Sequence, residues 1–141
     1  MGDTLSTIET FIGKHHVMGL ATSHDNTPQA CSLFYAYMSA RTLFVVASDE
    51  KTEHMGNATI NPQVAATIVL ETKTVGKIEG LQIKAQMRRA DEAETKAYFE
   101  TFPYARVMNP TLWAVVPHHM KLTDNRLGFG KKLIWTRGSS E

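Results

Sequence analysis

Residues 80–88 alternate without exception between apolar and polar side chains, and this pattern constrains the fold more than any other in the chain. Successive side chains of a β-strand point to opposite faces of a sheet, whereas a helix repeats about every 3.6 residues. The segment therefore predicts a strand with one buried and one exposed face. Its apolar positions are Leu81, Ile83, Ala85 and Met87, and its polar positions are Gln82, Lys84, Gln86 and Arg88.

Strand-like patterns recur along the rest of the chain. Residues 17–22 and 29–38 flank a turn-rich segment at 23–28 and predict a hairpin. The wholly apolar segment 43–47 predicts a third strand that is buried on both faces. Further strands are expected at 63–71, at 111–116 and 119–123, which form one long strand or two joined by a kink at Pro117, and at 127–135 with a glycine kink.

Helices are expected before, between and after these strands. Apolar residues at helical spacing predict an amphipathic helix over 4–15. Ser48 and Asp49 are candidate caps for a short helix over 48–57. Asp91, followed three residues later by Glu94, has the spacing of a capping box. That box predicts a helix that ends near residue 102, with a helical turn over 103–108.

This order of elements predicts an α+β fold in which six or seven mainly antiparallel strands form a closed sheet or barrel with peripheral helices. The length of 141 residues, of which 43% are hydrophobic and 21% charged, is typical of one globular domain. We therefore expect a single domain over residues 1–141. Such a chain buries enough surface to fold without disulfides or a structural metal.

Charge and cysteine content exclude several classes of protein. Fifteen basic against fourteen acidic residues give a net charge of +1, which offers no field for steering toward nucleic acid or anionic lipid. The longest apolar runs, 43–47 and 64–70, are far shorter than the roughly 18 to 20 residues of a membrane helix. A single cysteine and the absence of a secretory leader predict a cytoplasmic protein.

Metal and nucleophile patterns are weak. Two histidine pairs, His15-His16 and His118-His119, place adjacent side chains in divergent directions, so neither pair is a chelating unit. Cys31 falls within a predicted strand rather than at a helix N-terminus that would lower its pKa, and we interpret it as a core residue. The sequence predicts no metal site and no nucleophilic centre.

A phosphate site is the best candidate from the residues themselves. Ser48, Lys51 and Thr52 follow a buried strand, precede or open a short helix, and are followed by His54. Hydroxyl groups, an ammonium group and the amides of a helix start suit a terminal phosphate ester. Asp49 and Glu50 in the same segment are negative charges that oppose an anion.

Two other surfaces are candidates for ligand contact. Phe129 and Trp135 could cover a planar ligand, although core or dimer contacts are the more common use of aromatic residues. The glycines of Gly128-Phe129-Gly130 come too late in the chain for a dinucleotide fingerprint and are expected to kink a strand. A basic surface, or simply a solvated sheet face, is expected from Lys84, Arg88, Arg89, Lys131 and Lys132.

Five stretches carry a resemblance to a known family and together span about residues 5–137. They are His16-Val17 with the strand Cys31-Ser32-Leu33-Phe34-Tyr35, the segment 48–54, the segments 80–85 and 87–89, Phe102-Pro103-Tyr104-Ala105-Arg106, and the segment 123–135. With the order of elements, they resemble the YhbP-like branch of the pyridoxamine 5'-phosphate oxidase-like proteins. That resemblance implies an FMN-binding split barrel.

The resemblance also implies a homodimer with FMN at the subunit interface. The second and third strands of the family contact the flavin ring and ribityl chain, which points to Ser32, Leu33, Phe34 and Val46. Groups after the third strand hold the phosphate in the family, which matches Ser48, Lys51 and Thr52. A glutamine on a later long strand approaches the flavin, and Gln82 is the matching residue.

The chain departs from pyridoxamine phosphate oxidases at two places. The serine-arginine-lysine cluster of those enzymes is replaced by Ser48-Asp49-Glu50-Lys51, and the last residues read Trp135-Thr136-Arg137-Gly138-Ser139-Ser140-Glu141. The resemblance therefore implies a flavin-dependent oxidoreductase or reductase of a different small molecule, with NADH and NADPH as candidate reductants.

Two alternatives to catalysis remain open. One is a protein that binds flavin or haem without turnover, with His16, His54 or His118 as an axial ligand. The other is a cofactor-free structural dimer.

Overall fold

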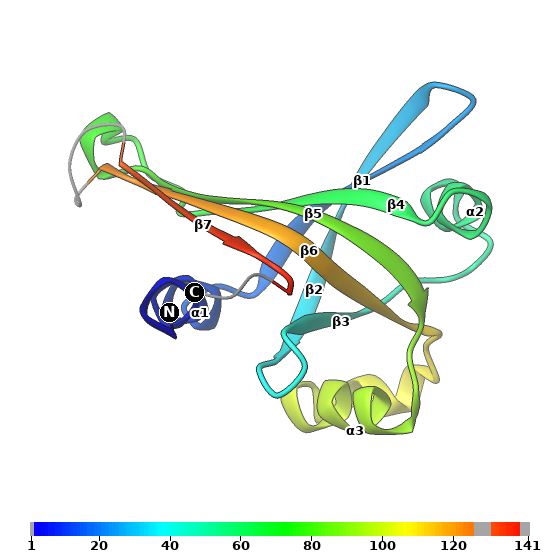
Figure 1. Ribbon diagram of the computed structural model, residues 1–141. Helices are drawn as coiled ribbons and strands as arrows, with labels where there is room; N and C mark the ends of the chain where they lie inside the picture. Colours follow the sequence, from blue (N-terminus) through cyan, green and yellow to red (C-terminus); the bar gives the residue numbers. More distant parts are fainter. Residues whose placement is uncertain (1, 126–130, 139–141) are drawn as a thin grey trace.

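The computed structural model describes residues 2–125 and 131–138 of the chain. These residues form seven strands: β1 (Val17–His24), β2 (Thr27–Met38), β3 (Leu43–Ala47), β4 (Gln63–Val69), β5 (Glu79–Arg89), β6 (Leu112–Asp124) and β7 (Lys132–Thr136). They also form the helices α1 (Gly2–Gly13), α2 (Glu53–Ile60) and α3 (Glu92–Thr101), and the 3₁₀ helices η1 (Val75–Lys77) and η2 (Pro103–Met108). Figure 1 shows their arrangement.

The strands form one antiparallel sheet in the order β3-β2-β1-β4-β5-β6-β7, and β3 also pairs with β6. This last pairing joins the two sides of the sheet, so that six strands close into a split barrel with β7 added outside the ring. β6 is long enough to serve both purposes, because its first part pairs with β3 and its second part with β7. The fold class predicted from the sequence is confirmed.

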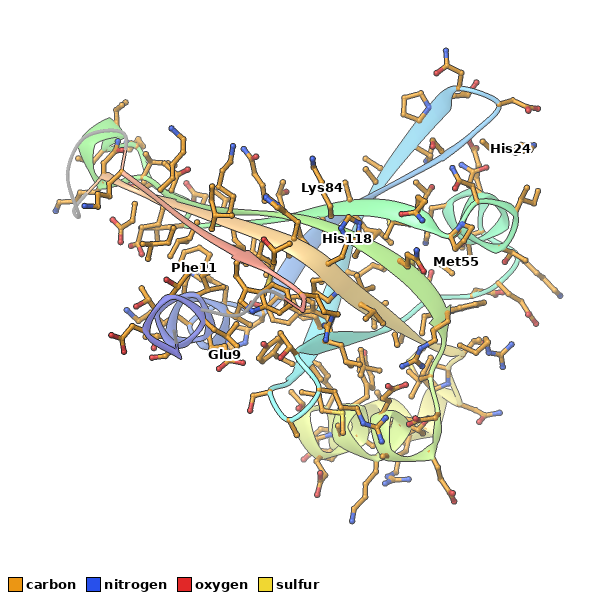
Figure 2. All side chains as sticks on the ribbon, in the orientation of Figure 1. Glu9, Phe11, His24, Met55, Lys84 and His118 are labelled. Atoms are coloured by element: carbon orange, nitrogen blue, oxygen red, sulfur yellow. The ribbon has the colours of Figure 1, made fainter. Side chains whose placement is uncertain are left out.

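The core fills the barrel and is closed by two helices. Every second residue of β5 is buried, as the alternation over 80–88 predicts. Ile8, Phe11 and Ile12 of α1 and Met55 of α2 join the same buried cluster as the strands. The labelled side chains of Phe11 and Met55 point from their helices toward the sheet, from opposite sides of the barrel (Figure 2).

The third helix covers part of the outer surface of the barrel. A second apolar cluster joins α3 to the far sides of β2 and β3, with Ala36, Leu43, Val45, Tyr98 and Leu112 as its buried members. The predicted capping box at Asp91 and Glu94 is confirmed. Glu94 is fully buried and accepts hydrogen bonds from both terminal nitrogens of Arg88 at 2.8 and 2.7 Å and from Arg41 at 3.0 Å.

Several strand boundaries differ from the sequence-based expectation. The β1–β2 turn is shorter than 23–28, because Asp25 and Asn26 both adopt a positive φ and close a two-residue turn, as hairpins of this kind require. Pro28 therefore lies within β2. β4 ends at Val69 rather than residue 71.

The residue Pro117 does not divide the sixth strand. β6 runs through it without a break, and the register to β5 shifts between Lys84 and Ala85, opposite His118. A bulge disrupts the regular ladder and so accommodates a proline, which has no N–H to donate. The bulge also reverses the order in which the side chains of β6 point in and out, because Val115 and Met120 are both fully buried.

The second helix begins later than expected. Thr52, not Ser48 or Asp49, is its N-cap, and the helix runs from Glu53 to Ile60 rather than over 48–57. Asp49 instead forms a turn, in which its side chain accepts a hydrogen bond from the amide of Lys51 at 2.9 Å. Ser48 and Lys51 thus precede the helix.

Smaller differences concern the ends of the chain. The first helix spans Gly2–Gly13 rather than 4–15, and η1 was not predicted. β7 overlaps the end of the strand expected over 127–135 and extends one residue beyond it, to Thr136. Gly128, Phe129 and Gly130 fall outside the described residues. Within residues 2–125 and 131–138, no helix combines the length and apolarity needed to cross a bilayer.

Candidate functional site

Ser48, Thr52 and His54 converge after β3, and we call them the hydroxyl cluster. The Nε2 atom of His54 lies 2.7 Å from Oγ of Ser48 and 3.3 Å from Oγ1 of Thr52. The indole nitrogen of Trp113 donates to the backbone oxygen of Ser48 at 2.8 Å and fixes the end of the strand. Burial lowers the pKa of His54, which favours the neutral imidazole at pH 7.

The rest of this segment supplies charge. Lys51 is exposed, and the amides of Glu53 and His54 belong to the first turn of α2, where a helix leaves its N–H groups without intrahelical partners. The carboxylate of Glu50 lies 3.7 Å from Arg89, and that of Asp49 is turned toward the amide of Lys51. Both acidic groups that oppose an anion in the sequence are therefore engaged locally.

A second group of candidate residues lies on the outer face of the sheet. Strand pairing places Ser32 opposite Gly19, Gly19 opposite Thr67, and Thr67 opposite Gln82, in one row across four strands. Ser32 and Gln82 are exposed. The structure thus brings two of the predicted flavin-contacting residues onto the same face, with only small side chains between them.

The other predicted flavin contacts point elsewhere. Val46 is fully buried in the barrel, and Leu33 packs against the same core, so only their backbone could meet a ligand on the outer face. Phe34 is 59% exposed and contacts Phe102 edge to face, with the ring centres 5.9 Å apart. The candidates therefore separate into an outer-face group and the hydroxyl cluster with Lys51.

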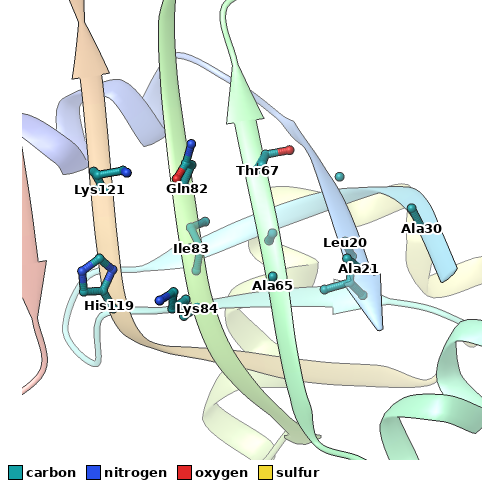
Figure 3. A pocket seen from close by; sticks show the side chains of 12 residues that line it. Leu20, Ala21, Ala30, Ala65, Thr67, Gln82, Ile83, Lys84, His119 and Lys121 are labelled. Carbon is teal, nitrogen blue, oxygen red and sulfur yellow. The ribbon is translucent and has the colours of Figure 1, made fainter. Parts of the chain in front are cut away.

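A hollow of about 490 Å³ lies on this outer face, across β1, β4, β5 and β6 (Figure 3). Gly19, Ala21, Ala30 and Ala65 contribute small side chains to it, and Thr67 and Gln82 contribute polar groups. Three further lining residues are Lys84, His119 and Lys121. Neither His119 nor Lys121 was predicted from the sequence to contact a ligand.

The sequence pattern predicts the exposed face for only some of the residues that line the hollow. The alternation over 80–88 places Gln82 and Lys84 on the exposed face, and the structure confirms it. Their cross-strand partners, Lys121 and His119, reach the same face because of the bulge at residue 118. Alternation carried on from Val115 would have placed both of them inside the barrel.

The remaining candidates have mainly structural partners. Arg88 is held by Glu94, and Arg89 lies 5.2 Å from the ring centre of Trp113 and pairs with Glu50, so the expected basic surface is divided. Cys31 packs against the core, where burial raises its pKa. In the described part of the chain, no three His, Cys, Asp or Glu side chains gather in a way that could hold a metal ion.

The C-terminal Arg137 is likewise occupied. Its guanidinium donates to the backbone oxygens of Pro117 at 2.8 Å and Thr42 at 2.5 Å. It therefore fastens the end of the chain to the bulge and to the β2–β3 turn. These bonds leave Arg137 as part of the scaffold.

Solved structures share this fold. A haem-binding protein from Mycobacterium smegmatis aligns with a TM-score of 0.74 at 17% identity over 90% of this chain, which spans 55% of that longer protein. An FAD-binding protein from Mesorhizobium loti aligns with a TM-score of 0.71 at 11% identity, covering 84% of this chain and 90% of its own. HutZ, a haem storage protein from Vibrio cholerae, has a TM-score of 0.65 at 15% identity, with 79% and 88% covered.

Sequence relatives are much closer. No protein-family model matches the chain. The UPF0306 protein YhbP of Salmonella arizonae is 37% identical over 142 residues, which cover 98% of this chain and 97% of that protein. YhbP of Escherichia coli O157:H7 is 36% identical over 141 residues, with 97% and 96% covered. Identity at this level over nearly the full length of both chains shows that the protein belongs to the UPF0306 family of YhbP proteins.

Proposed function

We propose that the protein is a pyridoxamine 5'-phosphate oxidase-like split barrel that binds FMN and acts as a flavin-dependent oxidoreductase on a small molecule. The hydroxyl cluster beside Lys51 is the observation that carries the proposal. Two hydroxyl groups meet one imidazole there, at the first turn of a helix, and the exposed Lys51 directly precedes Thr52 in the chain. This set of donors suits a phosphate monoester such as the end of FMN.

Each predicted contact residue would have a defined part in binding FMN. Ser48 and Lys51 would bind the phosphate. Thr52 caps α2, and its hydroxyl, which donates to the backbone oxygen of Asp49 at 2.8 Å, would exchange that bond for one to the phosphate. Ser32 and Gln82, exposed on one face, would hydrogen-bond to the polar edge of the ring system, with Phe34 beside its apolar part. Leu33 and Val46 would contribute through their backbone.

The flavin, once bound, supplies the electron transfer, and the protein supplies binding and orientation. Ser32 and Gln82 are neutral, so they would orient the ring without adding charge. Neither side chain is placed to act as an acid or base, and no such residue is proposed. The residues around the flavin would determine which substrate binds. NADH or NADPH would supply the electrons.

A second copy of the chain belongs to the proposal. Tyr104, Val107 and Met108 of η2 are 91%, 88% and 81% exposed, and Phe34 lies near them through its contact with Phe102. Exposed apolar groups of this kind mark interaction surfaces. A homodimer would cover them, and a monomer mass in sedimentation equilibrium would contradict this part of the proposal. A reducing cytoplasm suits the free thiol of Cys31.

An absorption spectrum tests the cofactor. Purified protein is mixed with excess FMN, desalted and scanned. The proposal predicts flavin bands that remain at a ratio near one per chain and that bleach on addition of NADH or NADPH. A spectrum with only the protein band after desalting would refute it, and retained flavin that neither nucleotide reduces would refute the oxidoreductase part.

Haem binding without turnover is the second candidate. Of the histidines expected as axial ligands, His16 is exposed and His54 is engaged by Ser48, whereas His118 is exposed at the bulge. The neighbouring His119 lines the hollow, and this placement favours the candidate. A Soret band on haem titration that is lost in His119→Ala would support it, and a band equal in both proteins would remove His119 from the site.

A further inference from the structure

The hollow on the outer face is lined by two lysines and a histidine. Lys84 of β5 lies opposite His119 of β6, and Lys121 lies two residues further along β6, opposite Gln82. Within residues 2–125 and 131–138, none of the three side chains has a hydrogen-bond or ion-pair partner. Figure 3 shows the three side chains along one side of the hollow. No aspartate or glutamate lines it.

The other side of the hollow is flat and apolar. Its strands carry Gly19, Ala21 and Ala65, whose small side chains leave the backbone surface open to a ligand. At Gly19, an added Cβ would come within 3.3 Å of Oγ1 of Thr67, so the hydroxyl of Thr67 borders this surface. A flat molecule could therefore lie against these strands at van der Waals distance.

Among the described residues, unpaired lysines beside a surface of small apolar side chains distinguish the hollow from the rest of the sheet. The chain as a whole has a net charge of only +1, so the gathering of cations is local rather than a general basic character. Farther along β5, Arg88 and Arg89 are both paired with carboxylates. The volume of about 490 Å³ lies within the roughly 300 to 1,000 Å³ typical of small-molecule sites.

We propose that this hollow binds a flat small anion, of the class of aromatic carboxylates. The ring lies on Ala21 and Ala65, and the carboxylate is held by the ammonium groups of Lys84 and Lys121. Because Gln82 belongs both to the hollow and to the proposed flavin contacts, this anion is the substrate class of the oxidoreductase. That last role rests on the proposed function, whereas the binding site does not.

Calorimetric titration with 2-naphthoate tests the site, and the uncharged 2-naphthamide is the matched probe. The wild type should bind naphthoate, and Lys84→Gln/Lys121→Gln should bind it about tenfold or more weakly, since two charge-assisted contacts are lost. Naphthamide should bind weakly to both proteins. A control variant, Lys73→Gln/Lys96→Gln, removes the same charge from exposed positions outside the hollow and should bind as the wild type does.

A second variant tests the flat side independently. Ala65→Phe places a ring where the ligand should lie, on an exposed position that does not disturb the core. It should abolish naphthoate binding while the thermal unfolding of the protein stays the same. Equal naphthoate affinity in the wild type and in either hollow variant would overturn the proposal.

Two further arms separate other occupants of the hollow. FMN is titrated into the same proteins, because FMN is itself a flat anion. If Lys84→Gln/Lys121→Gln weakens FMN as much as naphthoate, the hollow holds the flavin phosphate and the proposal fails. If FMN binds to none of the proteins while naphthoate binds as expected, the proposed function fails and the site stands. If naphthoate does not bind and Ala65→Phe converts dimers to monomers, the face is an interface between copies and the proposal fails.

Discussion

The outer surface of the sheet under α3 and the outer surface that forms the hollow differ in side-chain size and in how their charges are partnered. Under α3, the strands present Leu43 and Val45 to a helix, and the buried Glu94 is surrounded by donors. At the hollow, the strands present glycine and alanine, and the ammonium groups of Lys84 and Lys121 are unpaired within the described residues. The contacts under α3 stabilise the fold, whereas the two ammonium groups at the hollow can form ion pairs with a ligand.

The largest effect on stability is expected at Glu94. Glu94→Gln removes the charge that two guanidinium groups share, and it leaves part of that hydrogen bonding unsatisfied in a buried place. We expect a loss of about 2 kcal/mol in the free energy of unfolding. Urea denaturation measures it, with Glu92→Gln on the exposed side of α3 as the control. Equal midpoints for the two variants would show that the buried carboxylate is not stabilising.

Lowering the pH should also reduce the free energy of unfolding, because the carboxyl groups of Asp91 and Glu94 become protonated. The hydrogen bonds from Arg88, above other contacts, lower the pKa of Glu94, and the amide of residue 94 followed by Arg41 lowers that of Asp91. A carboxyl whose pKa is lower in the folded state stabilises the protein fully above its ordinary pKa, and the stabilisation is lost as the pH falls toward the lowered value. Unfolding free energy should therefore fall below about pH 5.

The variant Glu94→Gln supplies the control for this pH dependence. It lacks the titrating group, so its unfolding free energy should change less between about pH 5 and pH 3 than that of the wild type. Parallel curves for the two proteins would assign the acid sensitivity to other carboxyl groups.

The smallest effect on stability is expected at the hollow. Lys84→Gln/Lys121→Gln removes no ion pair among the described residues, so the free energy of unfolding should change by less than about 0.5 kcal/mol. The same urea experiment measures it. A loss as large as that of Glu94→Gln would mean that the two lysines stabilise the fold, and the contrast between the two regions would disappear.

Local patterns in the sequence predicted much of the fold. The alternation over 80–88 and the capping box at Asp91 and Glu94 depend on neighbours a few residues away, and both are confirmed. The start of α2 was not predicted correctly, because Ser48, Asp49 and Thr52 are all good caps. The choice among them depends on the turn at Asp49 and on the hydrogen bond between Ser48 and His54.

Contacts between distant segments were beyond local patterns. The carboxylate of Glu94 is bound by Arg41, which is 53 positions away. The hollow needs a bulge opposite Lys84 to turn His119 and Lys121 outward, and nothing in a run of apolar and polar residues fixes a register shift. The hydroxyl cluster was predicted as a segment, whereas the part played by its imidazole became visible only in the folded chain.

The central claim is that the phosphate of FMN binds beside the hydroxyl cluster, and a calorimetric titration of FMN into Lys51→Ala tests it most directly. Lys51 is exposed, so its removal should leave the fold intact. We expect FMN to bind the wild type near one per chain and Lys51→Ala about tenfold more weakly, which corresponds to one charge-assisted contact. Lys73→Ala, at another exposed lysine, should bind as the wild type does. Equal affinity in all three proteins, or no binding to the wild type, would contradict the account.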